Sequence, residues 1–234
     1  MGEPGTAASI DLWTWRLSSG EDEAASCLSP DEHERARRFR APADAARFRA
    51  ARSGLRRRLA LYARRPAASL RFEANAWGKP SLSGARAPHF NLSHAGDWAA
   101  LAVSWTVEVG VDIEVIRPVE AGVADLLAPA ERAALARLAP GEAWARGFYR
   151  CWTRKEAVVK ALGLGLSRPL DSFDVSLDAD DPPRLLRLDG EPDAARRWSL
   201  FHLSLEESCL GAVAAPRPGC RLVWKEGVPG PGGR

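Results

Sequence analysis

Three acidic residues stand in patterns that could bind a divalent metal ion. Asp112 and Glu114 alternate with apolar residues in the stretch GVDIE, which predicts a strand carrying both carboxylates on one face. Two carboxylates about 7 Å apart along a strand repel each other unless a cation or hydrogen-bond donors lie between them. Mg²⁺ commonly binds one or two carboxylates together with phosphate oxygens, although a bare D-x-E pattern is more often only a polar strand end.

Glu156 is the third acidic residue, and it lies in a stretch that predicts an amphipathic helix over residues 141–162. Trp152, Glu156 and Lys160 are spaced four residues apart and therefore share one stripe of that helix. Taken alone, Glu156 and Lys160 form an ordinary surface ion pair worth about 0.3–0.5 kcal/mol. Taken with the two strand carboxylates, Glu156 completes a set of three oxygen ligands with open positions for a substrate.

Lysine is rare in this chain, because only four of the 33 Lys and Arg residues are Lys. Three of the four, Lys79, Lys155 and Lys160, lie in the stretches that carry the other candidate residues. A compact ammonium group differs from the guanidinium fork of arginine and suits phosphate binding near a metal ion. The lysines therefore favour a site that handles phosphate.

Ser93 and His94 end the apolar run FNLSH. A lone Ser-His pair is more often a turn than a nucleophile, and no G-x-S-x-G pattern accompanies it. Both side chains could instead donate hydrogen bonds to phosphate. The sequence also lacks a P-loop, a Rossmann glycine pattern, H-E-x-x-H and an EF-hand loop, so a nucleotide would be bound in another way.

The N-terminal helices are strongly basic. Between residues 31 and 65 there are twelve Arg and four acidic residues. A solvated helix face is the common explanation for such a pattern, and a surface that binds a polyanion is the alternative. A nucleic-acid-binding arm fits less well, because the arginines alternate with a regular apolar stripe and the net charge of the whole chain is only +3.

The order of the predicted elements indicates an α+β protein made of two similar halves. The first half, residues 1–114, has a strand at 10–17, a helix that starts at 29–32 and runs to about 40, and a helix at 44–63. An antiparallel meander of strands at 89–92, 98–104 and 107–113 completes it. Helices at 129–138 and 141–162 and short strands at 173–177, 185–188, 198–203, 210–215 and 222–224 form the second half, residues 115–226. Residues 227–234 are predicted to be a disordered tail.

The composition is that of a soluble globular protein. The chain has 234 residues, of which 46% are hydrophobic, and no apolar run approaches the roughly 20 residues of a membrane span. The four cysteines are scattered and the first residues lack a signal-peptide pattern. We expect a cytoplasmic protein that does not bind membranes or nucleic acid.

Four motifs together resemble one enzyme family. They are WGKP at 77–80, FNLSH at 90–94, GVDIE at 110–114, and FYxxWxxKEAxxK followed by GxGL at 148–166. In this combination the sequence resembles the 4′-phosphopantetheinyl transferase superfamily, specifically its larger, monomeric Sfp type. The likeness covers about residues 29–175.

The resemblance implies a transferase that moves the 4′-phosphopantetheine arm of coenzyme A onto a serine of an acyl or peptidyl carrier protein and releases 3′,5′-ADP. Such carriers serve fatty acid, polyketide or nonribosomal peptide biosynthesis. It also implies two α+β halves related by a pseudo-twofold axis, with coenzyme A and Mg²⁺ in the cleft between them.

The resemblance implies roles for individual positions as well. It places Mg²⁺ on Asp112, Glu114 and Glu156, with Glu156 taking the serine proton and Lys160 acting in catalysis. Coenzyme A would contact basic, polar and ring side chains, namely Arg35, Arg47, Lys79, Pro80, Ser93, His94, Lys155 and Lys160. Within this set Arg35 and Arg47 would bind the 3′-phosphate, while Lys79 and Pro80 would lie near the adenine.

The chain departs from the family pattern at three positions. Ala95 stands where a hydroxyl residue is common, Glu32 stands where a lysine can occur, and Ile113 supplies no metal ligand between the two strand carboxylates. Two alternative functions stay open at this point: a member that binds coenzyme A or a carrier without turnover, and a nucleic-acid-binding protein.

Overall fold

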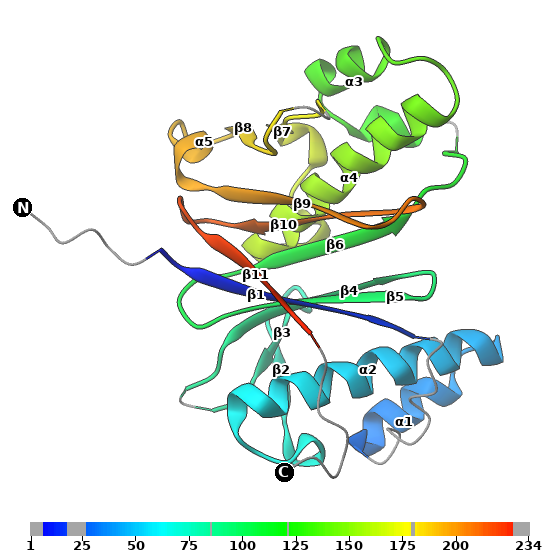
Figure 1. Cartoon of the computed structure of the whole chain (residues 1–234), viewed down its shortest axis with the longest axis vertical. Coiled ribbons are helices and arrows are strands. Elements are labelled where there is room, and N and C mark those ends of the chain that lie inside the picture. The colour runs from blue at the N-terminus through cyan, green and yellow to red at the C-terminus, as the bar shows by residue number, and fades with distance from the viewer. Residues whose placement is uncertain (1–6, 18–26, 85, 121, 179–180, 227–234) are drawn as a thin grey trace, which may run out of the picture.

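The computed structural model describes residues 7–17, 27–84, 86–120, 122–178 and 181–226, and it confirms a mixed α+β fold (Figure 1). Its α-helices are α1 (Pro30–Arg37), α2 (Pro42–Ala63), α3 (Pro129–Leu135), α4 (Glu142–Leu162) and α5 (Ala194–Arg197). Its strands are β1 (Ser9–Arg16), β2 (Phe72–Ala74), β3 (Pro80–Leu82), β4 (His89–Ala95), β5 (Trp98–Ser104), β6 (Gly110–Val115), β7 (Phe173–Val175), β8 (Leu185–Leu188), β9 (Ser199–Glu206), β10 (Cys209–Ala215) and β11 (Arg221–Lys225). The predicted tail at 227–234 lies outside the described residues.

Two larger sheets form the centre of the molecule, and helices cover their outer sides (Figure 1). One sheet has the strand order β11-β1-β5-β4, in which β11 and β1 are parallel and the other neighbours antiparallel. The other has the order β6-β10-β9 and is antiparallel throughout. Short pairs, β2 with β3 and β7 with β8, stand beside them.

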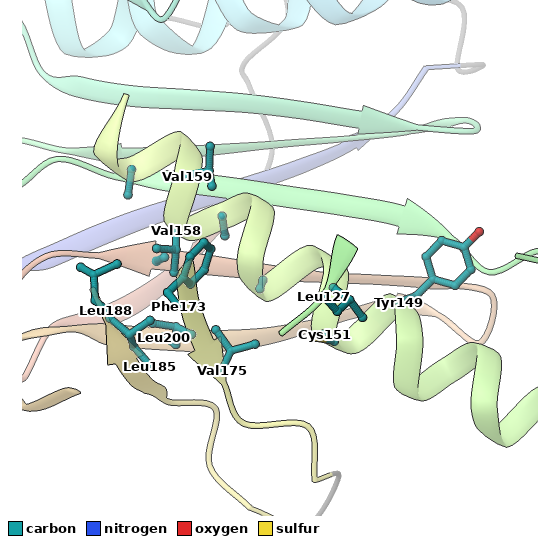
Figure 2. Packing of buried hydrophobic residues seen from close by; sticks show 14 of the residues in the cluster. Leu127, Tyr149, Cys151, Val158, Val159, Phe173, Val175, Leu185, Leu188 and Leu200 are labelled. Atoms are coloured by element: carbon teal, nitrogen blue, oxygen red, sulfur yellow. The ribbon is translucent and has the colours of Figure 1, made fainter. Parts of the chain in front are cut away.

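The alternation of side chains along β1 explains the layering. Ile10 and Leu12 point into a core between the two sheets, whereas Trp13 and Trp15 point into a second core beneath α2. A third core lies on the other side, where Figure 2 shows Val158 of α4 beside Phe173 of β7. Among the described residues no helix has both the length and the apolarity needed to cross a membrane.

The predicted meander over residues 89–113 is wrong at its third strand. Strands β4 and β5 do form an antiparallel hairpin, but β6 pairs with β10 instead of β5. The reason is that β1 occupies the other edge of β5, so no edge is left for β6. The division expected after residue 114 falls inside β6, whose hydrogen-bonded partner comes from the C-terminal part of the chain.

Side chains of β4 join the two sheets across the gap to β6. The Asn91 side-chain carbonyl accepts a hydrogen bond from the Val111 amide at 2.9 Å, and the Ser93 hydroxyl accepts one from the Ile113 amide at 3.3 Å. These two amides are on the edge of β6 that does not pair with β10. A polar residue at every second position of β4 therefore replaces a backbone ladder and brings Ser93 next to Asp112.

Helix α4 approaches β6 closely because Gly110 has no side chain. A Cβ atom placed on Gly110 would lie 2.0 Å from the carbonyl oxygen of Ala157 and 2.4 Å from the amide nitrogen of Ala161. The helix backbone itself thus packs on the start of β6. As predicted, α4 ends at Gly163, which adopts a left-handed conformation with φ of 69° and donates its amide to Val159 at 3.0 Å.

Candidate active site

Asp112 is the centre of the candidate site, at the point where β4, β6 and α4 meet. The Asp112 side chain is buried, and its Oδ1 atom accepts hydrogen bonds from Lys160 Nζ at 2.6 Å and from Ser93 Oγ at 3.1 Å. Its Oδ2 atom is also buried and has no hydrogen-bond partner among the described residues. A buried carboxylate oxygen without a donor is costly, and a cation or a water molecule is what ordinarily satisfies one.

The three predicted carboxylates lie in one another's electric field. Burial raises the pKa of Asp112 above its ordinary value, although Lys160 opposes that change. Burial, and then the charge of Asp112, raise the pKa values of Glu114 and Glu156. The helix and the strand therefore bring these side chains together, and negative charge accumulates where a divalent cation would relieve it.

The donor set fits Mg²⁺ and other cations that prefer oxygen ligands better than it fits Zn²⁺ or copper. It consists of carboxylate oxygens, which are hard ligands, and it contains no thiolate or imidazole. Over the described ranges no three His, Cys, Asp or Glu side chains are already arranged around a single point. The ammonium group of Lys160 instead contacts Asp112, so cation binding at Asp112 and Glu156 would require Lys160 to share that carboxylate or to turn toward a bound phosphate.

An open groove of about 710 Å³ reaches β4 at Asn91 and His94, on either side of Ser93, and collects several of the predicted ligand-binding residues. Arg35, Arg47, Pro80 and His94 all line it. The guanidinium group of Arg35 lies 5.2 Å from the centre of the Phe48 ring, which also lines the groove. The basic helices thus turn part of their charge toward this groove.

The electrostatics of the groove favour an anion. Arg47 forms ion pairs with Asp97 at 3.2 Å and Asp44 at 3.4 Å, both at solvent-exposed carboxylates that give little net stabilisation. Desolvation of the His94 ring, and then the positive charge of Lys160, lower the pKa of His94. An anion placed between His94 and Lys160 would reverse the second effect.

Ser93 and its neighbour His94 have different surroundings. The Ser93 hydroxyl donates to Asp112, accepts from the Ile113 amide and lies 3.3 Å from Lys160 Nζ. The two residues point in opposite directions because they are adjacent in a strand. Ser93 therefore holds the Asp112 carboxylate, while His94 reaches the groove.

Arg52 is a groove residue that sequence reasoning missed. It lines the groove and pairs with Glu32, whose carboxylate also caps the start of α1 and pairs with Arg56 at 2.6 Å. Glu32 is thus a buried residue that ties α1 to α2 and sets Arg52 at the edge of the groove. Nothing in the local sequence pattern distinguishes Arg52 from the other arginines of α2, so the sequence alone does not predict that Arg52 lines the groove.

Lys155 lies in the protein core and not at the predicted phosphate-binding surface. Its side chain is completely buried and forms an ion pair with Glu131 at 2.8 Å, and its Nζ atom donates to the carbonyl oxygens of Leu170, at 2.7 Å, and Phe173. Glu131 in turn accepts from the amides of Ala128 and Val175. The expectation that Lys155 faces coenzyme A is therefore corrected: Lys155 links α4 to the loop before β7.

We expect Lys155→Met to unfold much more easily than the wild type while its folded fraction binds coenzyme A normally. The substitution leaves Glu131 buried without its cation, and breaking a buried pair in this way costs about 3–5 kcal/mol. Urea unfolding measures the loss, and the exposed Arg137→Met is the control for removal of a positive charge. A stable Lys155→Met protein with weakened coenzyme A binding would contradict this assignment.

The residues of the candidate site indicate an enzyme that acts on phosphorylated substrates. Carboxylates, a lysine and an arginine-lined groove are groups that such enzymes use. A sequence model described as the 4′-phosphopantetheinyl transferase superfamily matches residues 108–213, and one described as the N-terminal part of 4′-phosphopantetheinyl transferase matches residues 14–106.

Individual relatives agree with the family models. The chain is 34% identical over 223 residues to the 4′-phosphopantetheinyl transferase HetI of Nostoc sp., covering 89% of each chain. It is 34% identical to a 4′-phosphopantetheinyl transferase of Bacillus subtilis, with 86% and 88% covered, and 32% identical to Sfp of Bacillus subtilis, with 70% and 73% covered. The chain therefore belongs to the 4′-phosphopantetheinyl transferase superfamily, and it is a transferase.

Proposed function

We propose that the protein transfers the 4′-phosphopantetheine arm of coenzyme A to a serine of an acyl or peptidyl carrier protein, with Mg²⁺, and releases 3′,5′-ADP. One observation carries this proposal: the buried Asp112 carboxylate is held by Ser93 and Lys160, its second oxygen is free of donors, and its charge raises the pKa values of Glu114 and Glu156. Such a site is suited to a cation that carries a pyrophosphate.

The reaction needs a nucleophile, a proton acceptor and charge neutralisation. The carrier serine oxygen forms a bond to the phosphorus of the phosphopantetheine group, and the bond from that phosphorus to the bridging oxygen of the pyrophosphate breaks. The electron pair of the broken bond leaves with 3′,5′-ADP, and the serine proton goes to Glu156, directly or through water. The raised pKa of Glu156 suits a general base.

Lys160 and the metal ligands divide the remaining work. Mg²⁺ bound by Asp112, Glu114 and Glu156 would neutralise the pyrophosphate. Lys160 lies one helical turn after Glu156, and its ammonium group can move from Asp112 to a phosphate oxygen. In this proposal Arg35, Arg47 and His94 bind the 3′-phosphate end of coenzyme A.

A second groove, of about 330 Å³, provides space for the pantetheine arm and the carrier serine. Glu114, Tyr149 and Trp152 border it, so it reaches one of the three carboxylates. The Trp152 ring stacks on Phe148 with the ring centres 5.6 Å apart, which fixes the wall of this groove. Residues from the N-terminal and the C-terminal parts of the chain together form the candidate site, so a second subunit is not needed to complete it, and we therefore propose that the enzyme acts as a monomer.

Intact-mass analysis of apo carrier proteins incubated with coenzyme A and Mg²⁺ tests the proposed function. We expect a phosphopantetheine adduct on at least one acyl or peptidyl carrier, together with release of 3′,5′-ADP. A carrier in which the acceptor serine is replaced by alanine is the control. Binding of coenzyme A without an adduct on any carrier would instead indicate a member without turnover.

Binding of Mg²⁺ is expected to weaken as the pH falls. The pKa values of Asp112, Glu114 and Glu156 are raised in the folded protein, so protons compete with the cation at a higher pH than for ordinary carboxylates. A carboxyl group whose pKa is raised by folding favours the folded state when it is protonated and disfavours it when it is ionised. Acidification therefore relieves the repulsion among the three carboxylates in the metal-free protein. Thermal unfolding with and without Mg²⁺ should show a smaller stabilisation at about pH 6 than at about pH 8.

Thermal unfolding in potassium chloride at the same ionic strength is the control for salt screening. Screening of exposed charges is then the same in both salts, so a difference in stability reports binding of Mg²⁺. An Mg²⁺-dependent stabilisation that is equal at both pH values would remove these carboxylates from the cation site.

A further inference from the structure

Lys79, in the turn between β2 and β3, contacts the C-terminal end of helix α4. Its Nζ atom donates to the carbonyl oxygen of Ala161 at 3.1 Å, in the last turn of α4, and pairs with Glu108 at 2.5 Å. It also lies 3.4 Å from the carbonyl oxygen of Val109, just before β6. The last carbonyl groups of a helix have no partner within the helix and carry partial negative charge, so an ammonium group stabilises them.

Asn75 makes a second contact from the same turn. Its side-chain amide donates to the carbonyl oxygen of Gly163 at 2.9 Å, and its side-chain oxygen accepts from the amides of Trp77 and Lys79. Asn75 therefore shapes the turn between β2 and β3 and also attaches that turn to the end of α4. The WGKP motif and the GxGL motif, far apart in the sequence, meet here.

Val158, Val159 and Ala161 in the last turns of α4 are buried in the third core, while Lys79 and Asn75 hold carbonyl groups at its end. Over Gly110 the helix backbone itself packs on β6, so this contact sets the distance between the two elements. Lys160 directly precedes Ala161, and its ammonium group must reach Asp112 at 2.6 Å. A shift of the helix end along its axis would therefore move Lys160 and Glu156 away from Asp112.

We propose that Lys79 is a positioning residue for the transfer reaction, because it fixes the C-terminal end of α4 against β6 and so sets Lys160 and Glu156 against Asp112. The proposal rests on the proposed function. It differs from a direct role at the adenine, since Pro80 lines the groove and the Lys79 ammonium is directed at Glu108 and Ala161. Lys79 acts on the rate of the chemical step more than on the affinity for coenzyme A.

The experiment compares Lys79→Met, Lys79→Arg and Arg71→Met with the wild type. Arg71 is an exposed residue just before β2, so Arg71→Met controls for the loss of a positive charge in the same part of the molecule. Steady-state kinetics give kcat and the KM for coenzyme A, and calorimetry gives its Kd. Hydrogen exchange at the Leu162 and Gly163 amides reports the last turn of α4 without using activity.

We expect Lys79→Met to lower kcat by about 10- to 100-fold, as misplacement of reacting groups by about 1 Å does, with the Kd for coenzyme A within about twofold of wild type. The Leu162 and Gly163 amides should exchange faster. Lys79→Arg keeps a cation at the helix end and should recover much of the rate. Should Lys79→Met fail to fold, Glu108→Gln, which removes the charge that pairs with the ammonium group and with the neighbouring His89, is expected to give a smaller change of the same kind.

Two results would overturn the proposal: a weakened Kd for coenzyme A with unchanged kcat, which would make Lys79 a ligand-binding residue, or unchanged exchange at the end of α4 in Lys79→Met. Failure of the proposed function looks different. If the wild type modifies no carrier, the exchange measurement still decides whether Lys79 holds the end of α4.

Discussion

Glu156→Gln is expected to abolish transfer and, at the same time, to raise the thermal stability of the metal-free protein. As the proposed general base, Glu156 would contribute about 10²–10⁴-fold to the rate, and a glutamine cannot accept the serine proton. Burial and the charge of Asp112 raise the pKa of Glu156 in the fold, so the ionised side chain is a destabilising group at neutral pH. A neutral side chain of the same shape relieves that repulsion, and about 1 kcal/mol of relief raises Tm by roughly 2–4 °C in a chain of this size.

The two effects are separated by measuring transfer by intact mass and unfolding by calorimetry without Mg²⁺. Glu207→Gln, at an exposed carboxylate in the turn between β9 and β10, is the matched control and should change neither quantity. Wild-type transfer rates in Glu156→Gln would remove Glu156 from the mechanism. A lower Tm would show that Glu156 makes a stabilising contact in the fold rather than storing repulsion.

Gly110→Ala is the second substitution with a large expected effect. The new methyl group would meet the carbonyl oxygen of Ala157 at 2.0 Å, and this atom belongs to a helix backbone that cannot turn aside. Helix α4 must move away from β6, which breaks the 2.6 Å contact between Lys160 and Asp112. We expect a loss of stability of about 1–3 kcal/mol or more, as for other overpacked sites, and a fall in kcat of roughly 100-fold.

Gly147→Ala provides the matched control, because Gly147 also lies at a tight packing position of α4. A methyl group there would meet the Cδ1 atom of Leu138 at 2.3 Å, but this is the end of a flexible side chain that can rotate. Alanine also has a higher helix propensity than glycine by about 1 kcal/mol. Urea unfolding should therefore show little loss for Gly147→Ala, and equal losses in the two variants would contradict the proposed contact between the α4 backbone and β6.

Periodicity was sufficient to predict most elements near the site. The stripe of apolar residues predicted α2 and α4 to within a few residues, and alternation in GVDIE placed Asp112 and Glu114 on the same strand. The pairing of β6 was not predictable in this way. A strand sequence shows which face is apolar but does not say which edge receives a partner, and here β1 from the start of the chain takes the edge of β5.

The spacing of residues in α4 indicates that Lys155 is buried, whereas the family resemblance predicted that it faces coenzyme A. Lys155 follows Cys151 by four residues and shares the buried side of α4 with Val158 and Val159, whereas Glu156 and Lys160 occupy the stripe that faces β6. A charged residue within an apolar stripe needs a buried partner, and that partner, Glu131, comes from α3. Its identity depends on tertiary packing, which local spacing does not encode.

The role of Asn91 and Ser93 was also readable only in part. Their spacing of two in FNLSH predicts that both side chains leave β4 on the same side. That they accept hydrogen bonds from the free edge of β6 depends on where the second sheet lies. Sequence therefore predicted candidate residues, and the structure shows which of them, such as Ser93, hold another candidate in place.

The parallel pairing of β11 with β1 has a consequence for how the protein is made. These strands stand near opposite ends of the described chain, and β11 forms the edge of the sheet that carries Ser93 and His94. On the ribosome, β1 would wait with one edge unpaired until residues 221–225 have left the exit tunnel. The first sheet is completed only after residues 221–225 have been synthesised, so a nascent chain that stops short of β11 exposes a strand edge to other chains.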